Sequence, residues 1–270
     1  MSIEVSIIIV NYNSKRYLEN CISSIYLHNK SCNIEVIVVD NASVDNSLEQ
    51  IDTNDKDIKI IKNSQNLGFA KAANQGAKIA QGKYIFFLNP DIYLKNNAIK
   101  ILFDFMEHNK NCMVAGGLLT NENGKYTYSF GSLPKMKDSI FAAYGFYSLI
   151  KSEKVNINRI QETEQICGAD FFISKDLFFE IGMFSEDFFL YYEEIELCYR
   201  LRKKYKNKTI YFVPNAVMVH HQAACFDNKE ESQKYIKDGI NLYYKKTLKT
   251  PFKYIPIFLL GLAKILKYNK

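Results

Sequence analysis

The segment Tyr84–Asp91 constrains the fold more than any other part of the chain. Its first five residues are large and mostly apolar, which predicts a strand buried on both faces. Proline lacks the N–H that a central strand needs, so the chain must leave the sheet at Pro90 and place Asp91 at the strand's carboxyl end. Ligands of open α/β sheets bind at that edge. A carboxylate held there suits a hard divalent cation and phosphate oxygens, although a simple Asx-Pro turn has the same sequence.

The first 120 residues alternate short apolar runs with helical patterns. We expect strands at 5–10, 34–39, 58–61 and 84–88. Helical spacing of apolar residues predicts helices at 15–28, 68–81 and 97–108. Ser43 is suited to cap a further short helix between the second and third strands. This order is typical of an α/β fold with a mostly parallel, doubly wound sheet and flanking helices.

Beyond residue 118 the pattern loosens. Residues 121–165 mix glycine, serine, asparagine and aromatic residues, and we interpret them as a long excursion over the functional edge. Regular patterns return with a helix at about 192–205 and a pair of strands within 209–219. We predict one domain at 1–225 and a C-terminal helical, basic amphipathic extension at 226–270.

Cysteine usage and the first residues bear on the compartment. Six cysteines show no CxxC spacing, and several lie in apolar runs. This indicates reduced core thiols and excludes an obvious disulfide framework or zinc site. No secretory signal pattern follows Met1, so we expect a cytoplasmic protein.

The net charge of +6 is unevenly distributed. Residues 245–270 carry lysines between apolar side chains and no acidic residue, but Pro256 and Gly261 interrupt them, so the stretch is too broken to cross a bilayer. It is compatible with a peripheral contact on the inner face of the cell membrane. It is equally compatible with a helix that packs on its own domain or on the second subunit of a homodimer. We expect no nucleic-acid partner.

The usual nucleotide-binding and nucleophile motifs GxGxxG, GxxxxGK[ST] and GxSxG do not occur. Polar residues follow the strands instead: Asn11 and Asn13 after the first, Asp40 and Asn41 after the second, and Asn89 and Asp91 after the fourth. Parallel strands bring their carboxyl ends to one edge, where such groups can hold a base, a ribose and a diphosphate. Each of them alone is an ordinary turn residue.

The alanine-rich helix adds a second feature of this kind. Asn66 and Gly68 precede it, and Asn74 lies within it. The N-terminus of a helix favours anions, because its first N–H groups and the helix dipole point toward them. We therefore expect this helix to face the phosphates of a nucleotide.

Four segments, VSIIIVNYNS, EVIVVDNASVDNS, NLGFAKAANQGAKIAQGKYIFFLNPDI and FFLYYEEIELCYRLRKK, resemble the inverting glycosyltransferases of family 2. The resemblance is to the rhamnosyltransferase-like branch, which builds bacterial surface polysaccharides, and it covers about residues 3–225. It implies a GT-A fold and a divalent metal, Mn²⁺ or Mg²⁺, at the diphosphate of a nucleoside diphosphate sugar. The implied substrates are a dTDP or UDP sugar of rhamnose or another hexose and a glycan or lipid-linked acceptor.

The resemblance also assigns roles to residues. Asp91 matches the last aspartate of the DxD metal motif, and Asn89 stands where many relatives have an acid. His220 matches the metal-binding histidine of an H-x-x-G-x-S segment, which here reads HHQAAC, so a structural histidine pair remains an alternative. The implied nucleotide-sugar-binding residues are Asn11, Asn13, Asp40, Asn66, Gly68, Asn74, Asn89 and Asp170, the last through a sugar hydroxyl.

The implied general base lies in the segment Glu193-Glu194, which reads Glu-Asp in relatives. Glu194 takes the place of the aspartate, and Glu193 is the alternative. A glutamate is ionised at neutral pH and can accept a hydroxyl proton. Acidic residues in a first helical turn are also common for dipole reasons alone. The aromatic run 184–192 suits either a stacking wall for the acceptor or core packing.

The implied mechanism is a single displacement with inversion at the anomeric carbon. A nucleotide-sugar-binding protein without catalysis is one alternative, suggested by Asn89 and Glu194. A nucleotidyltransferase is another, although that class needs a glycine-rich basic loop where this chain has Asn11-Tyr12-Asn13-Ser14. A third is a membrane-tethered scaffold that uses the basic tail. The sequence does not select the donor sugar, the base, the acceptor or the metal.

Overall fold

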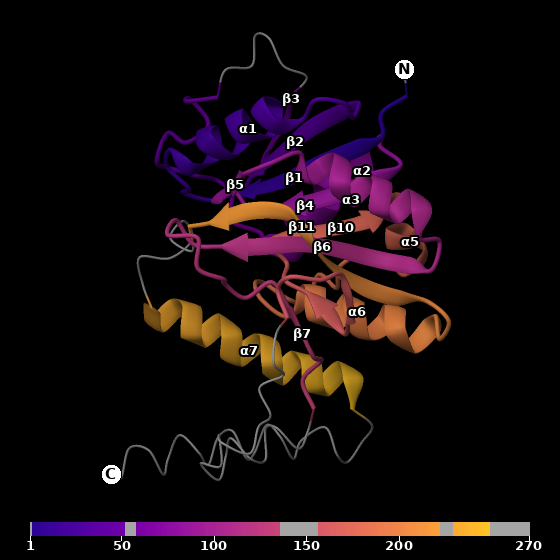
Figure 1. Ribbon diagram of the computed structural model, residues 1–270. Helices are drawn as coiled ribbons and strands as arrows, with labels where there is room; N and C mark the ends of the chain where they lie inside the picture. Colours follow the sequence, from indigo (N-terminus) through magenta and orange to yellow (C-terminus); the bar gives the residue numbers. More distant parts are fainter. Residues whose placement is uncertain (1, 52–57, 136–155, 222–228, 249–270) are drawn as a thin grey trace.

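The computed structural model describes residues 2–51, 58–135, 156–221 and 229–248. Its centre is one mixed sheet in the order β3-β2-β1-β4-β10-β6-β11-β5, and β8 pairs with β11 (Figure 1). The strands of this sheet are β1 (Val5–Asn11), β2 (Ile34–Asp40), β3 (Ile58–Lys62), β4 (Tyr84–Leu88), β5 (Ile92–Leu94), β6 (Cys112–Thr120), β8 (Gln161–Thr163), β10 (Asp170–Ser174) and β11 (Thr209–His220). The strands β7 (Phe130–Gly131) and β9 (Gln165–Ile166) form a separate antiparallel pair.

The N-terminal half of the sheet is parallel. Strand β1 pairs in parallel with β2 and β4, and β2 pairs in parallel with β3. All five residues of β4 are buried, as the apolar run predicts. Because Asn11 is the register partner of Asp40, both strands end at the same edge of the sheet.

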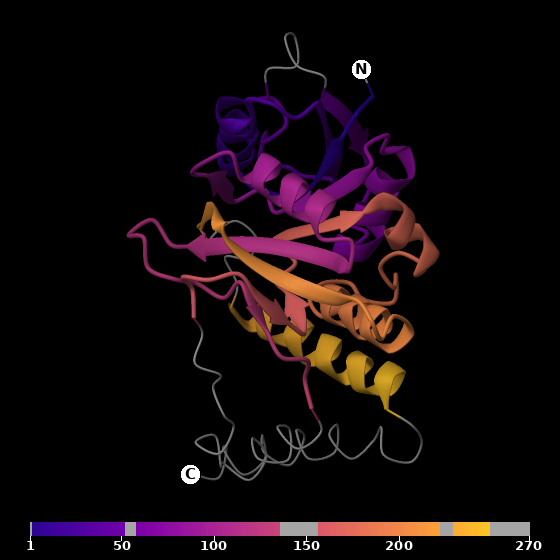
Figure 2. The same cartoon turned by 45° about the vertical axis from the view of Figure 1, so that its right-hand side comes forward.

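Helices cover both faces of the sheet. The helices α1 (Tyr17–His28) and α3 (Ala98–His108) pack on the face that carries Ile7 and Ile9. The helices α2 (Phe69–Ile79), α5 (Lys175–Glu180) and α6 (Glu193–Lys204) pack on the opposite face, which carries Ile8. Helix α7 (Lys229–Thr247) lies beside α6, away from the sheet (Figure 2). This is the doubly wound arrangement that the sequence predicts.

Two local predictions are wrong. Residues 41–51 form turns and no helix, because Ser43 uses its hydroxyl to bond the side chain of Asp40 and the N–H of Asn13. The strand pair expected within 209–219 is one strand, β11, whose pairing with β6 shifts register between Phe212 and Val217. Pro214 lacks the N–H that strand pairing needs, and the shift in register at this point lets β11 continue past it.

The second half of the sheet is mixed. Strand β10 runs antiparallel to both β4 and β6, whereas β11 runs parallel to β6 and antiparallel to β5. The free cysteines Cys21, Cys32, Cys112 and Cys198 are buried, and Cys167 is half-buried. Burial raises the pKa of Cys32 to about 11 and that of Cys112 to about 12, so these thiols stay protonated at neutral pH.

None of the helices in the described ranges is long and apolar enough to cross a membrane. The expectation of a peripheral membrane contact through 245–270 falls, from residue 249 on, outside the described residues.

Candidate functional site

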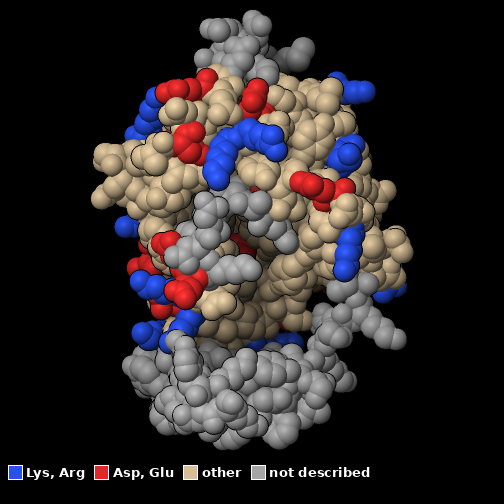
Figure 3. Space-filling model, turned by 90° about the vertical axis from the view of Figure 1, so that its left-hand side faces the viewer, with Lys and Arg blue, Asp and Glu red and all other residues tan. Residues whose placement is uncertain are grey.

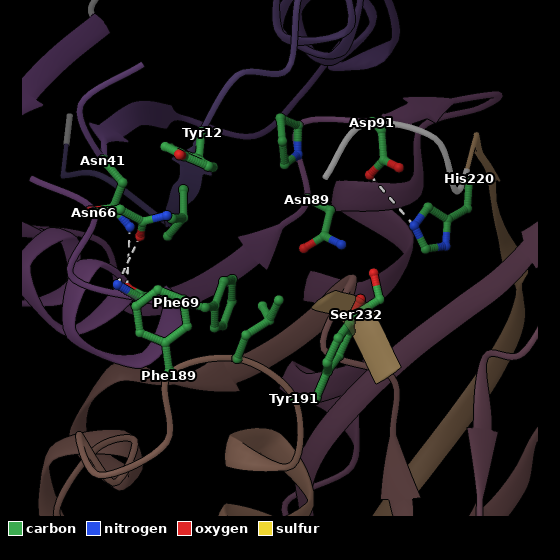
Figure 4. Close-up of a pocket in the computed structure, with 14 residues that line it drawn as sticks. Tyr12, Asn41, Asn66, Phe69, Asn89, Asp91, Phe189, Tyr191, His220 and Ser232 are labelled. Carbon is green, nitrogen blue, oxygen red and sulfur yellow. Dashed lines mark hydrogen bonds and ion pairs between the residues drawn. The ribbon is translucent and has the colours of Figure 1, made fainter. Parts of the chain in front are cut away.

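A cavity of about 280 Å³ opens at the carboxyl edge of the parallel strands. The arrowheads of β6 and β11 point to this side in Figure 1, and Figure 3 shows it hollowed, with acidic atoms visible inside. The cavity is lined by Val10, Tyr12, Asn41, Asn66, Gly68, Phe69, Asn89, Pro90, Asp91, Phe189, Leu190, Tyr191, His220 and Ser232 (Figure 4). Five of the residues predicted from sequence are therefore together: Asn66, Gly68, Asn89, Asp91 and His220.

Strand pairing brings Asp91 to His220. The chain turns at Pro90, and the short strand β5 then pairs antiparallel with the end of β11, so that Ile92 is the register partner of His220. The side chain of Asp91 is 3% exposed, and its Oδ1 lies 3.5 Å from Nε2 of His220. This separation is in the range of an ion pair and longer than a usual hydrogen bond, so the carboxylate and the imidazole face each other at close range.

Asp91 and His220 fit a site for a divalent metal that takes its remaining ligands from a bound substrate. Over the described ranges, no three His, Cys, Asp or Glu side chains form a group that could hold an ion. The Nδ1 atom of His220 is buried and has no hydrogen-bond partner in the part of the chain that the structure describes. One carboxylate and one imidazole are a sufficient protein share where substrate phosphates and water supply the remaining ligands, as is usual for Mg²⁺ and suits Mn²⁺.

The start of α2 forms the opposite wall. Gly68 has a φ of +82°, and its N–H donates to the side chain of Asn66 over 2.9 Å. The N–H of Phe69 donates to the carbonyl of Phe189 over 2.7 Å. These two N–H groups have partners within the protein, and phosphate binding at this helix N-terminus stays a prediction.

Glu193 and Glu194 begin α6 but sit in different surroundings. Glu193 is buried, and burial together with the nearby charge of Glu194 raises its pKa well above the usual range. Glu194 is half-buried. Burial raises its pKa to about 6, and hydrogen bonds from main-chain groups, including those of Ile195 and Gly168, hold it from rising further. At neutral pH, Glu194 is the ionised member of the pair.

A short chain of contacts links Glu194 to the cavity. A Cβ atom at Gly168 would lie 3.4 Å from Cδ of Glu194, so the carboxyl group rests directly on this glycine. The next residue, Ala169, accepts a hydrogen bond of 3.0 Å from the N–H of Asn89, which lines the cavity. The charges of Glu194 and Asp91 both act on the thiol of Cys167. Glu194 therefore lies on the same edge as Asn89 and Asp91, next to the cavity lining.

Three of the predicted binding residues, Asn11, Asn13 and Asp40, form hydrogen bonds within the protein. The Nδ2 group of Asn11 donates to Asp40 over 2.7 Å and to the hydroxyls of Ser43 and Ser47. The side chain of Asn13 accepts from the N–H of Val44 over 2.9 Å. Asn11, Asn13 and Asp40 are absent from the cavity lining, and their bonds fix the loops after β1 and β2. Their direct contact with a nucleotide stays a prediction.

Asn74 and Asp170 also lie away from the lining. Asn74 is buried, bonds the carbonyl and the N–H of Phe184, and so clamps the loop that follows α5. Asp170 is 0% exposed, and its Oδ2 accepts from the N–H of Gly117 over 2.6 Å. This burial raises the pKa of Asp170 well above the usual range, and its contact with a sugar hydroxyl stays a prediction.

Sequence reasoning missed part of the lining. Tyr12 lies between the predicted residues Asn11 and Asn13, and its position at a strand end could have identified it. Asn41, a polar strand-end residue to which the sequence assigns no separate role, also lines the cavity. The side chain of Asn41 donates to the carbonyl of Gly68 over 3.2 Å, which links β2 to α2. Of the aromatic run 184–192, Phe184 and Phe188 are core, whereas Phe189 and Tyr191 face the cavity. Ser232 on α7 also lines the cavity, and no sequence motif around it predicts this position.

Residues 6–182 match the family Glycosyl transferase family 2. The low-salt glycan biosynthesis hexosyltransferase Agl10 of Haloferax volcanii is 29% identical over 205 residues, which cover 74% of this chain and 62% of that protein. The dTDP-rhamnosyl transferase RfbF of Shigella flexneri is 25% identical over 225 residues, which cover 82% and 70%. The chain thus spans less than two thirds of the H. volcanii relative.

Solved structures share the fold. The mannosyltransferase PcManGT from Pyrobaculum calidifontis, in complex with GDP-Man and Mn²⁺, has a TM-score of 0.65 at 15% identity, with 100% of this chain and 75% of that chain covered. TarS 1-349 of S. aureus in complex with UDP-GlcNAc has a TM-score of 0.59 at 17% identity, with 98% and 72% covered. At this level of identity the similarity shows the architecture alone. The family match, together with this architecture, shows that the chain belongs to glycosyl transferase family 2 and has the GT-A fold.

Proposed function

We propose that this protein transfers a hexose from a nucleoside diphosphate sugar to a glycan or lipid-linked acceptor, with inversion, in the assembly of a bacterial surface polysaccharide. One observation carries the proposal. The carboxyl edge of the sheet brings Asn89, Asp91 and His220 into one cavity. Glu194 rests on Gly168, the residue before Ala169, whose carbonyl oxygen accepts a hydrogen bond from the N–H of Asn89. A site for an activated donor and a basic carboxylate are therefore adjacent.

The donor is proposed from the cavity and from the relatives together. Tyr12 offers an aromatic face and Asn41 and Asn66 offer amides at one end of the cavity, whereas Asp91 and His220 lie at the other (Figure 4). This order suits a base and ribose at the amide end and a diphosphate at the Asp91 end. The name of RfbF specifies dTDP-rhamnose chemistry, and we therefore propose dTDP-rhamnose first and UDP-hexoses second.

Asp91 and His220 would hold the divalent ion, Mn²⁺ or Mg²⁺. When bound, it would supply positive charge to the departing nucleoside diphosphate. The PcManGT structure, which contains Mn²⁺, supports the use of such a metal in this fold. The protein's own contribution is to keep a carboxylate and an imidazole 3.5 Å apart at the end of the cavity.

Glu194 is proposed as the general base, and Glu193 is not. With its pKa raised to about 6, Glu194 is ionised at neutral pH yet close enough to the working pH to be an effective proton acceptor. Burial and the neighbouring charge of Glu194 raise the pKa of Glu193 well above its usual range, which makes Glu193 the less suitable base. In the proposed step the acceptor oxygen attacks the anomeric carbon, its proton passes to Glu194, and the nucleoside diphosphate leaves from the opposite face.

The experiment is a turnover assay that measures release of the free nucleoside diphosphate from dTDP-rhamnose, UDP-glucose, UDP-galactose and UDP-N-acetylglucosamine, with Mn²⁺ and a simple sugar or water as acceptor. We expect turnover with one donor, lost in Glu194→Gln and in Asp91→Asn. Asp104→Asn, on the outer face of α3, serves as the matched control and should keep full activity. Tight binding of a nucleotide sugar without any turnover would favour the catalytically inactive binding protein instead.

The place of action is proposed from the sequence of the tail. Lysines with no acidic residue among them in 245–270 suit the anionic inner face of the cell membrane, where a lipid-linked acceptor is found. Flotation of the full chain with anionic vesicles, compared with a variant in which Lys264, Lys267 and Lys270 become glutamate, tests this. Equal flotation of both proteins would contradict it and favour packing of the tail on the protein or in a homodimer.

A further inference from the structure

Helix α7 reaches the cavity from outside the matched family region. The family match ends at residue 182, whereas α7 covers Lys229–Thr247. Ser232 on this helix lines the cavity, and Figure 4 shows it beside Tyr191 and near Asn89 and His220. The helix is therefore part of the wall of the site and does more than extend the domain.

The same helix packs on the segment that leads into Glu193 and Glu194. The rings of Tyr235 and Phe189 stack with centroids 4.9 Å apart and an angle of 22° between their planes. Further along α7, Tyr243 and Tyr244 are buried in a cluster that also contains Phe188 and Tyr192. At the end of α7, the hydroxyl of Tyr199 on α6 donates to the carbonyl of Thr247 over 3.0 Å, which joins the two helices there as well.

The segment held in this way has an unfavourable backbone. Tyr191 and Tyr192 have φ values of 67° and 75°, in the left-handed region that residues with a Cβ avoid. Tyr192 is the N-cap residue of α6, and no side chain caps the helix there. Two consecutive tyrosines in this conformation persist only where surrounding contacts impose it, and such strain is typical of functional sites.

Gly239 on α7 lies directly against this pair of tyrosines. A Cβ atom at position 239 would lie 2.7 Å from the carbonyl oxygen of Tyr191 and 2.9 Å from Cδ2 of Tyr192. The glycine is buried in the middle of α7, where glycine is otherwise unfavourable for a helix. Its small size therefore lets the helix axis approach the strained pair closely, and any side chain would push the pair away.

We propose that Gly239 is a positioning residue for transfer: through α7 it holds Tyr191 and Tyr192 in the left-handed conformation that places Glu194 beside the donor cavity. This inference rests on the proposed function. Glu194 follows Tyr192 by two residues, and its carboxyl group rests on Gly168 with no room for a large shift. A displacement of about 1 Å in this segment moves the base away from the acceptor oxygen without removing any group that touches the donor.

The test is Gly239→Ala in the full chain, with Lys237→Ala on the exposed face of α7 as the matched control. We expect kcat for release of the nucleoside diphosphate to fall by about tenfold or more, with KM for the donor changed by less than about twofold. The acidic limb of the kcat–pH profile should shift by about half a pH unit or more, because the surroundings of Glu194 change. Lys237→Ala should match the wild type in all three quantities.

A purely structural role predicts a different pattern. The contact with Tyr191 and Tyr192 would then lower Tm in Gly239→Ala, but kcat and the pH profile would be as in the wild type. That result overturns the proposal. Tyr235→Ala, which loses the ring stack and adds no atoms, gives a second test should Gly239→Ala not fold. It should lower kcat in the same way, and wild-type kcat in this variant contradicts the proposal.

Failure of the proposed function would look different again. In that case the wild-type chain releases no nucleoside diphosphate from any of the four donors, and no variant can be slower. Turnover by the wild type with unaltered turnover by Gly239→Ala and Tyr235→Ala rejects the role of α7 alone.

Discussion

The main-chain N–H of Phe69 donates a hydrogen bond of 2.7 Å to the carbonyl oxygen of Phe189. The bond joins the first turn of α2, inside the matched family region, to a loop beyond its end at residue 182. Both residues line the cavity, so the bond fixes the distance between two of its walls. It also gives the N–H of Phe69 a partner that a phosphate would otherwise have to provide.

Substitution of Gly68 tests the contact between the start of α2 and Phe189 in the cavity lining. A Cβ there would lie 2.5 Å from the carbonyl oxygen of Phe189, at a φ of +82°. We expect Gly68→Ala to lower the free energy of unfolding by about 3 kcal/mol, from the left-handed backbone and the clash together. Gly124→Ala is the control, because Gly124 has a φ of +73° and nothing within 4 Å of its Cβ position. Gly124→Ala should lower the free energy of unfolding by only about 1 kcal/mol.

Urea denaturation measures both values, and titration with dTDP and UDP measures the effect on binding. Nucleotide affinity should fall in Gly68→Ala and stay unchanged in Gly124→Ala. Equal losses of stability in the two variants would mean that the contact with Phe189 is unimportant.

Asn74 is expected to act on stability. Its side chain bonds both main-chain groups of Phe184 in a buried setting. Asn74→Ala would leave these groups without partners, at a cost of about 2 to 3 kcal/mol in the free energy of unfolding. Lys78→Ala, on the exposed side of the same helix, should be neutral. A variant Asn74→Ala that is as stable as the wild type but fails to bind nucleotide would restore the direct binding role predicted from sequence.

Glu194 couples activity to pH. Because it must be ionised to act as a base, kcat should fall as pH drops through about 6. Its folded-state pKa lies above the usual value of 4.5, so the protonated form stabilises the fold below pH 4.5, and this contribution is lost as pH rises through about 6. Glu194→Gln should therefore abolish turnover and raise the free energy of unfolding at pH 8 by about 2 kcal/mol, with no gain at pH 4.

Glu196→Gln is the matched control for that prediction. Glu196 lies on the same helix and accepts from Nε of Arg200 over 2.8 Å. Its replacement should lower stability at pH 8 and leave the acidic limb of the kcat profile in place. Denaturation of both variants at pH 4 and pH 8 gives the comparison. A loss of stability in Glu194→Gln at pH 8 would contradict the predicted cost of its charge.

His220 and His221 are neighbours with different expected roles. His220 faces Asp91, whereas Nδ1 of His221 lies 2.6 Å from Oε1 of Glu122, which is well exposed. We expect Mn²⁺ to strengthen nucleotide binding to the wild type and to His221→Ala. In His220→Ala the gain from Mn²⁺ should shrink by about tenfold or more. Calorimetric titration of dTDP and UDP with and without Mn²⁺ measures this, and equal effects of both substitutions would argue for a structural histidine pair.

Much of the fold can be predicted from the sequence because it depends on properties of neighbouring residues, such as an apolar run or a proline. The buried run Tyr84–Leu88 becomes the buried strand β4, and Pro90 ends it where the absence of an N–H requires. Asp91 and His220 were matched one by one to family motifs, and the pairing of β5 with β11 confirms that they meet. Their metal role stays a prediction.

Other features depend on contacts between distant segments and could not be predicted. The side chains of Asn11 and Asp40 bond each other, because paired strands bring together two turn residues that look available when considered separately. Asp170 looks like a loop residue, yet it enters β10 between two strands and is buried. Ser232 reaches the cavity only because α7 packs on α6, far away in sequence.

The most direct measurement is the thermal stability of the protein with dTDP, UDP and their sugars, each with and without Mn²⁺. A ligand that binds only the folded state stabilises it by mass action and so raises Tm. At a ligand concentration of 100 Kd, the free energy of unfolding rises by about 2.7 kcal/mol. We predict a shift that requires both a nucleotide and Mn²⁺ and that disappears in Asp91→Ala. No shift with any of these ligands, from well-folded wild-type protein, would contradict the donor site at the carboxyl edge.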